Sequence, residues 1–344
     1  MPPGRVLQTG QLFCYDESGA VVECRGTGQD GELRSGEAWP EPRFSPGDAT
    51  VFDRLTGLTW TRNATPAGFP LTWMEALDFI RGMNREALHG HADWRLPNRR
   101  ELRSLVSYQA RRPALPEDHP FYEVFPGWYW SSTTAAIHPA YAWYVHMDGA
   151  RMFYGGKEQY SLVWPVRGVS RVLPVTGQHG CFDAKGNPVP CVDTVEDGFE
   201  PTGIMWPGDR FLIRAEFVED RLTGLEWLRR ATLSEEPVSW AGALGLVAEL
   251  NRQQHREENP WRLPNINELE SLVDASRHAP ALPGDHPFTG VRDVYWSSTT
   301  SFFEPDWAWA LYLDKGATGV GVKRNPTFFA WPVRDVEKER SPIS

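Results

Sequence analysis

The side chains best suited to acid–base chemistry are two histidines, each next to an aspartate. His119 follows Asp118 in a DHPF segment, and His286 follows Asp285 in an identical one. A carboxylate beside an imidazole can orient it as a general base. No serine or cysteine nucleophile motif accompanies either pair, and loop side chains of this kind commonly bond to backbone groups. We therefore expect no catalytic residues and a protein that is not an enzyme.

The four cysteines form two pairs with the same spacing. Cys14 and Cys24 are ten residues apart, as are Cys181 and Cys191, and each pair brackets a glycine turn. Four cysteines permit three connectivities, but a hairpin places the members of each pair on facing strands, which favours two local disulfides. Zinc is the competing interpretation, although no CxxC spacing is present and His179 accompanies only one pair.

Disulfides imply an oxidising compartment, so we expect an extracellular or cell-surface protein, with the periplasm left open. The first five residues, MPPGR, lack the apolar core of a signal peptide, which conflicts with that expectation. The paired cysteines are the stronger signal. The net charge of −10 and the absence of a basic run argue against a nucleic-acid partner. No apolar stretch reaches the roughly 18 residues of a membrane span.

The chain contains two copies of one sequence unit. Four segments recur at a distance of 166 or 167 residues: DRLTGL (53–58, 220–225), WRLPN (94–98, 261–265), YWSSTT (129–134, 295–300) and WPVR (164–167, 331–334). Solenoid repeats are only roughly 20–50 residues long, so each copy should be a domain with its own core. We predict a first domain at 1–169, a second at 170–338 and a polar tail at 339–344.

Each copy predicts two helices followed by a sheet. Thr72 with Glu75 and Asn98 with Glu101 form capping boxes before apolar helical faces. The equivalent caps in the second copy are Ser239 and Asn265. Strand-like segments separated by Gly and Pro loops follow at 128–132, 142–147, 151–154 and 162–167. The expected fold class is α+β, with two helices and a twisted antiparallel sheet in each domain.

The WRLPN, YWSSTT and VWPVR segments, with TGQ (9–11) and CYD (14–16) upstream, resemble the Lcl C-terminal domain family over nearly all of both copies. The RLPxxxE helix start is also similar to that of formylglycine-generating enzymes, which implies tandem C-type lectin-like domains with long loops forming a ligand surface. Members of this wider group are typically surface or secreted binding proteins, including adhesins that recognise glycans. The copper-binding late cysteines of the enzymes are missing, since all four cysteines lie early in each copy.

Calcium is the one cofactor that the sequence leaves open. Glu304-Pro305-Asp306 resembles the Glu-Pro-Asn motif of animal C-type lectins, but the accompanying Trp-Asn-Asp motif is absent. Oxygen ligands for Ca²⁺ are also present in two acidic glycine loops. These loops contain Asp30, Gly31 and Glu32 in the first copy and Asp193, Asp197, Gly198 and Glu200 in the second. Such loops are more often solvated turns, so we expect no metal ligands.

The places where the copies differ are the candidate binding sites. The loops 135–141 and 301–307, and the segments 151–161 and 317–328, differ between copies that otherwise match. Mixtures of Tyr, Trp, Arg and Asn of this kind are typical of paratopes, although neutral drift would also produce them. The predicted ligand-binding residues are Tyr141, Tyr144, His146, Arg151, Tyr154, Lys157, Tyr160, Phe302, Phe303, Trp307, Tyr312, Lys323, Arg324 and Asn325.

Most of the sixteen tryptophans have a partner in the other copy and are predicted to be core. Trp128, Trp206 and Trp307 are interpreted as unpaired, which favours ligand contact. The sequence thus predicts a surface or secreted binding protein that recognises a glycan or a protein. A self-assembling subunit of a surface appendage is the alternative, and an oxidase of the formylglycine-generating type is third.

Overall fold

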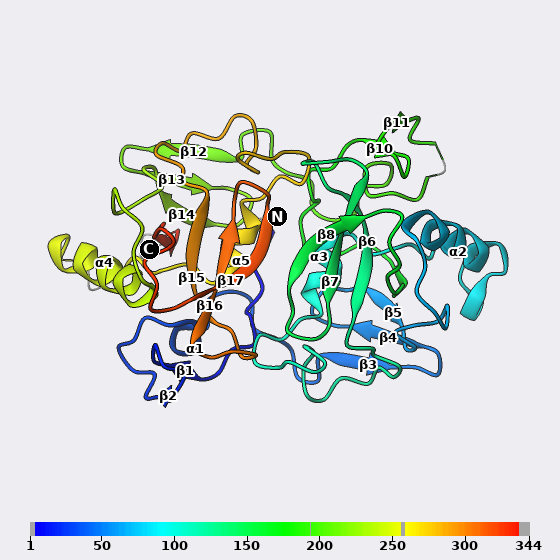
Figure 1. Cartoon of the computed structure of the whole chain (residues 1–344), viewed down its shortest axis with the longest axis horizontal. Coiled ribbons are helices and arrows are strands. Elements are labelled where there is room, and N and C mark those ends of the chain that lie inside the picture. Colours follow the sequence, from blue (N-terminus) through cyan, green and yellow to red (C-terminus); the bar gives the residue numbers. More distant parts are fainter. Residues whose placement is uncertain (1–3, 193, 256–258, 337–344) are drawn as a thin grey trace, which may run out of the picture.

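The computed structural model describes residues 4–192, 194–255 and 259–336 (Figure 1), so the predicted polar tail and Asp193 lie outside the described residues. It confirms an α+β chain in two repeated halves. The helices are α1 (Asp30–Leu33), α2 (Trp73–Arg85), α3 (Arg99–Ser104), α4 (Trp240–Gln253) and α5 (Ile266–Ser271), with a 3₁₀ turn at Leu88–Gly90.

The predicted helix starts are confirmed by their caps. Thr72 and Asn98 each accept a hydrogen bond from the backbone N–H three residues on, and Glu75 and Glu101 complete the capping boxes. Ser239 caps α4 and Asn265 caps α5 in the same way, although only Asn265 has a capping-box glutamate. The short helix α1 lies in a segment predicted to be a loop, because its four residues offer no helical apolar period.

The strands pair into two small hairpins, two four-stranded sheets and one six-stranded sheet. The hairpins are β1 (Cys14–Tyr15) with β2 (Val21–Val22), and β10 (Cys181–Phe182) with β11 (Pro188–Val189). The four-stranded sheets are β3 (Phe44–Pro46), β4 (Thr50–Asp53), β5 (Thr59–Thr61) and β9 (Val166–Arg167), and β12 (Phe211–Arg214), β13 (Phe217–Asp220), β14 (Leu225–Leu228) and β18 (Val333–Asp335).

The six-stranded sheet spans both halves of the molecule. Its order is β15 (Val294–Thr300), β16 (Trp307–Tyr312), β17 (Ala317–Val322), β8 (Met152–Gly156), β7 (Tyr141–His146) and β6 (Trp128–Thr134). Each half supplies a three-stranded antiparallel meander, and the two meet where Thr318 pairs with Met152. Figure 1 shows the two meanders side by side at the centre, with α2 and α4 at opposite ends.

The cysteine hairpins cross between the halves. We call residues 4–37 and 171–204 the first and second opening segments, and 44–167 and 211–335 the first and second cores. The β1–β2 hairpin lies beside β15 and β16 of the second core, whereas β10–β11 lies beside the first core (Figure 1). Gly19 in the first hairpin turn approaches Pro305, and Gly186 in the second approaches Pro139. Each hairpin is therefore docked on the core that it does not directly precede.

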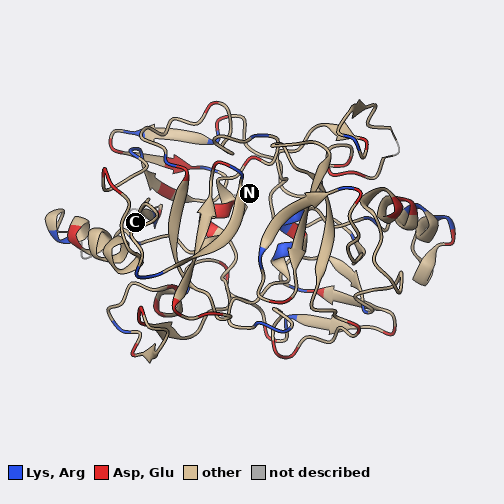
Figure 2. Ribbon diagram, in the orientation of Figure 1, with Lys and Arg blue, Asp and Glu red and all other residues tan. Residues whose placement is uncertain are grey.

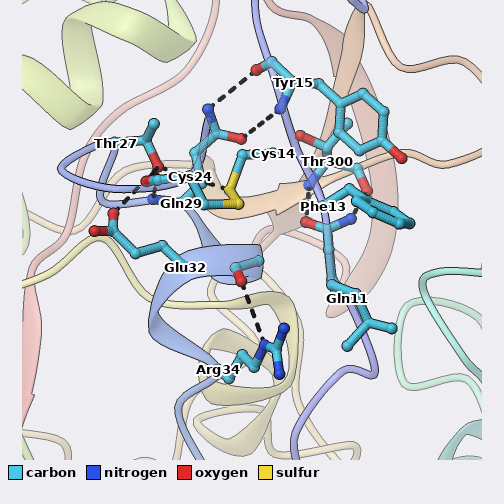
Figure 3. The surroundings of a disulfide bond; sticks show 12 residues. Gln11, Phe13, Cys14, Tyr15, Cys24, Thr27, Gln29, Glu32, Arg34 and Thr300 are labelled. Atoms are coloured by element: carbon cyan, nitrogen blue, oxygen red, sulfur yellow. Dashed lines mark hydrogen bonds between the residues drawn. A yellow bond between two sulfur atoms is a disulfide. The ribbon is translucent and has the colours of Figure 1, made fainter. Parts of the chain in front are cut away.

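Both predicted disulfides are confirmed, as Cys14–Cys24 and Cys181–Cys191. Around the first one (Figure 3), the Gln29 amide donates to Tyr15 O and accepts from Tyr15 N, while Gln11 reaches Thr300 of the second core. The bridge closes a hairpin whose strands have only two residues each, too short to persist alone. The disulfide therefore keeps the hairpin in the form that docks.

The paired tryptophans fill the interior, as predicted. All twelve members of the six predicted pairs are buried. One expectation is corrected: Trp206 is not unpaired, because Trp39 lies 167 residues earlier and stands in the same contacts. Arg43 lies over the Trp39 ring and Arg210 lies over the Trp206 ring, at 4.7 and 4.9 Å. In the part of the chain that the structure describes, no helix is long and apolar enough to cross a membrane.

Candidate ligand-binding site

Aromatic side chains of the first core gather on one side of the six-stranded sheet. The Trp128 ring centroid lies 4.0 Å from that of Tyr144 and 4.6 Å from that of His146. Trp130 is 5.4 Å from Tyr144 and is buried beneath it. Trp128, Tyr144 and His146 are half-buried, so their rings present edges and faces to solvent. We call these four residues the first sheet-face cluster.

Strand register and one glycine hold this cluster in place. Trp128 pairs with His146 and Trp130 with Tyr144 across β6 and β7, and directly opposed residues project from the same side of a sheet. The Tyr144 ring lies over Gly155 of β8. A Cβ at Gly155 would be 2.2 Å from Tyr144 Cε1, so a larger residue there would displace the ring.

The second core carries a similar cluster, in which Trp296 and Tyr312 are equivalent to Trp130 and His146 and Phe328 is an additional ring. The Phe328 centroid lies 4.5 Å from Trp296 and 5.6 Å from Tyr312; Phe328 lies over Gly321, and Tyr312 lies over Gly319. Met152 and Thr318, which pair where the meanders meet, are equivalent positions, and both are buried. Because Met152 and Thr318 are opposed, they lie on the same side of the sheet, and each aromatic cluster lies on the other side. The two clusters therefore lie on one side of a continuous sheet. Burial raises the pKa of Tyr144 and Tyr312, which keeps both hydroxyls protonated and able to donate at neutral pH.

Three of the predicted binding residues, Tyr144, His146 and Tyr312, thus lie on this sheet face. Tyr141 and Tyr154 lie together at 5.9 Å, with Tyr154 packed on Trp143 of the core side. Arg151, Tyr160, Arg324 and Asn325 are exposed, Tyr160 at 70%. Phe302, Phe303 and Trp307 are half-buried in the β15–β16 region, where Phe303 approaches Gly149 of the first core.

The two predicted lysines contact the cysteine hairpins. Lys157 and Lys323 are buried, and their ammonium groups donate to hairpin carbonyls of the crossing opening segments. Lys157 Nζ donates to Phe182 O at 2.8 Å, and Lys323 Nζ donates to Asp16 O at 3.1 Å. Their cations lie 3.9 and 4.1 Å from the Trp73 and Trp240 rings. Both side chains fasten a hairpin to a core, which the local sequence could not reveal.

Burial lowers the pKa of both lysines. For Lys323 the pKa falls to about 7, because desolvation outweighs the attraction of Asp16, Asp306 and Glu17. For Lys157 desolvation again lowers the pKa, opposed by Glu196 and Asp183, and burial in turn raises the pKa of Glu196. The residue equivalent to Glu196 in the first opening segment is the neutral Gln29.

In the acidic loops considered for calcium, two aspartates accept hydrogen bonds from threonine hydroxyl groups. Asp30 Oδ2 accepts from Thr9 and Thr299 Oγ1 at 2.7 and 2.6 Å, and Asp197 Oδ2 accepts from Thr133 and Thr176 in the same way. Burial raises the pKa of each aspartate to about 6. Within the described residues, no group of three or more His, Cys, Asp or Glu side chains could hold a metal ion. A Ca²⁺ site remains a prediction.

The two Asp-His pairs lie in equivalent packed loops. His119 stacks on Phe121 and His286 stacks on Phe288, with ring centroids 6.1 and 6.0 Å apart. Burial lowers the pKa of both imidazoles, although Asp118 and Asp285 oppose the shift. The same geometry in both copies, against core aromatic rings, is typical of a structural role.

Charge is distributed unequally where the cores meet. Three buried arginines of α3, Arg99, Arg100 and Arg103, surround Glu270 of α5 with N–O distances of 3.4–3.5 Å. The equivalent positions of α5 are Ile266, Asn267 and Glu270. Figure 2 shows this contrast as blue on α3 and red on α5. Desolvation lowers the pKa of Arg99 to about 9, and its guanidinium lies 3.9 Å from the Trp143 ring.

Comparison with known proteins places both halves in one family. The search of curated proteins found no match, and the search of solved structures found none either. The Lcl C-terminal domain matches twice, at residues 49–167 and 216–334, which together make up more than half of the chain. Each match covers a core and omits the opening segment that precedes it. This protein belongs to the Lcl C-terminal domain family, with two tandem copies of the domain.

Proposed function

We propose that the protein is a non-enzymatic binding protein that recognises a glycan on the side of its six-stranded sheet that carries the first sheet-face cluster. The observation that carries this proposal is the first sheet-face cluster, where Trp128, Tyr144 and His146 expose packed aromatic rings next to polar atoms. Aromatic faces pack on the apolar faces of sugar rings, while hydroxyl and imidazole groups bond to sugar hydroxyls.

The second cluster extends the same surface. Tyr312 and Phe328 lie on the same side of the sheet, over Gly319 and Gly321 of β17. A glycan long enough to reach both clusters would gain affinity from the second contact without a further loss of translational freedom. This favours an extended oligosaccharide over a small ligand. The disulfides are consistent with a secreted or periplasmic protein, and a cell-surface location belongs to the proposal.

A glycan array probed with the full chain tests the proposal. We expect binding to an oligosaccharide that weakens at least tenfold in Trp128→Ala, because the stacking ring is lost. Phe52→Ala is the matched control, since Phe52 is 44% exposed and lies in β4, outside the six-stranded sheet. Thermal melting verifies that both variants fold. No bound glycan, or equal binding by wild type and Trp128→Ala, would disprove the proposal.

A further inference from the structure

A cavity of about 120 Å³ lies where the second opening segment meets both cores. Its walls come from the β6–β7 loop (Thr134, Ala136), the second opening segment (Gln178, His179, Phe182) and Ser276 of the second core. It is at the opposite end of the β6–β7 hairpin from Trp128 and His146. The cavity is therefore separate from the sheet-face clusters, and its role does not rest on the glycan proposal.

The equivalent positions in the other half carry larger side chains. Ala136, Gly180 and Ser276 correspond by the repeat to Phe302, Phe13 and Gln109. Gln109 Oε1 accepts from Leu12 N at 2.8 Å, and its amide donates to the Tyr15 hydroxyl at 3.2 Å. Three large-to-small differences thus hollow out one of two related positions.

One glutamine differs in its bonding between the halves. Gln11 holds Thr300 with two backbone hydrogen bonds, donating to its O and accepting from its N, both at 2.8 Å. Its equivalent, Gln178, donates instead to Gly180 O at 3.2 Å. Gln178 is 7% exposed, and its Oε1 has no hydrogen-bond partner among the residues that the structure describes. A buried acceptor without a partner is unfavourable, and a donor group of a ligand would relieve that cost.

The other lining groups define the ligand. The Thr134 hydroxyl is also buried without a partner in the described part of the chain. Because the hydroxyl of its equivalent, Thr300, is in the same state, the free acceptor of Gln178 is the feature that distinguishes the cavity from the other half. His179 is exposed and turns Nδ1 toward Gly177 O, which leaves Nε2 as its other polar atom. Phe182, Ala136 and Pro139 supply apolar wall, and His179 is the one titratable side chain among the described lining residues.

From this geometry we infer that the cavity binds one neutral hydroxylated ring, a monosaccharide or the terminal sugar of a glycan. A sugar hydroxyl donates to Gln178 Oε1 and exchanges a hydrogen bond with Thr134, and the ring carbons lie against Phe182. A charged ligand would find no opposite charge to replace its hydration. The volume of about 120 Å³ limits the enclosed part of the ligand to no more than one ring.

Saturation-transfer NMR with the full chain and a panel of neutral monosaccharides tests the inference, followed by titration of each binder. We expect at least tenfold weaker binding in Gln178→Leu, which removes the acceptor, and in Ala136→Phe, which introduces the phenylalanine found at the equivalent position, Phe302. Trp128→Ala should bind the monosaccharide as wild type does, even where it loses an oligosaccharide. That contrast separates this cavity from the sheet-face site.

Two further arms complete the experiment. Ser276→Gln narrows the cavity from the second core and should weaken binding as Ala136→Phe does, so the test survives if one variant fails to fold. Comparing free monosaccharides with glycans ending in the same sugar distinguishes the two sources. No monosaccharide binding, or binding unchanged in both Gln178→Leu and the filled variants, would overturn the inference. Binding of simple amides in preference to sugars would overturn it as well.

Discussion

The two cysteine hairpins dock in the same way but with different electrostatics. Each is fastened by a buried lysine over a tryptophan and by a buried aspartate between two threonines. Lys157 has Glu196 nearby, whereas the equivalent of Glu196 beside Lys323 is the neutral Gln29. At the centre, three arginines of α3 meet one glutamate of α5. The hydrogen bonds of the lysines and aspartates are therefore shared by both halves, while the carboxylate at the Glu196 position is not.

Glu270→Gln should have the largest effect, because Glu270 is the carboxylate shared by Arg99, Arg100 and Arg103. Removing one partner of a buried ion pair costs about 3–5 kcal/mol. Arg103→Gln, at the equivalent position of α3, should cost less, because it also relieves repulsion among the arginines. Urea denaturation measures both. Equal losses would show that Glu270 does not hold the cluster together.

Breaking one disulfide tests which core each hairpin stabilises. Cys14→Ser with Cys24→Ser opens a loop of sequence separation 10 and should cost about 3 kcal/mol. Hydrogen exchange should then rise around Thr300 and Lys323 of the second core. Cys181→Ser with Cys191→Ser should instead expose Thr133 and Lys157 of the first core. Exchange that rises only in the core directly following the altered hairpin would contradict the crossed docking.

Lys323→Met should flatten the pH dependence of stability. The folded pKa of Lys323 is about 7, below its unfolded value, so the unfolded chain binds more protons between pH 7 and about 10. The free energy of unfolding therefore rises with pH in this window, by at most about 1.4 kcal/mol per pH unit. Urea titrations at pH 7, 8 and 9 measure the slope, which should persist if Lys323 does not titrate there.

Glu196→Gln replaces the carboxylate near Lys157 with the neutral amide that Gln29 provides at the equivalent position. It removes the carboxylate that raises the pKa of Lys157, so desolvation should lower that pKa further. The slope of stability against pH above 7 should steepen, opposite to the effect of Lys323→Met. The ¹⁵N chemical shift of Lys157 Nζ reports its titration, and an unchanged midpoint would show that Glu196 does not act on it.

The smallest effects should come from Asp30→Asn and Asp197→Asn, and they should be equal. Each aspartate has a folded pKa of about 6, against about 3.9 for an aspartate in the unfolded chain, so the folded chain binds more protons between these values. Stability therefore falls as pH rises from about 4 to 6. Each substitution should reduce this fall, as thermal melts across the window would show. Unequal effects would mean that the two docking sites differ in hydrogen bonding as well as in charge.

Several features follow from the sequence because they depend on neighbouring residues. The capping boxes of Thr72 with Glu75 and of Asn98 with Glu101 begin helices, and the glycine turns bring cysteines ten residues apart onto facing strands. The repeat identifies two cores, and its shared tryptophans identify their interiors. These inferences need no knowledge of long-range contacts.

The sequence predicted the candidate sites only in part. Tyr144, His146 and Tyr312 were predicted from loop and strand differences, but their shared sheet face was not. The cavity at Gln178 was missed, although comparing Gly180 with Phe13 and Ser276 with Gln109 along the repeat gives a usable signal. That signal has meaning only once the three segments are known to meet.

The sequence by itself determined the two copies, their helix starts, their disulfides and their buried tryptophans, since each is encoded within a short stretch of chain or in the repeat. Tertiary structure alone decided that each hairpin crosses to the other core, that the meanders join at Thr318 and Met152, and that Lys157 and Lys323 are buried. The physical reason is that these contacts join residues far apart in the chain, where local patterns carry no information about partners.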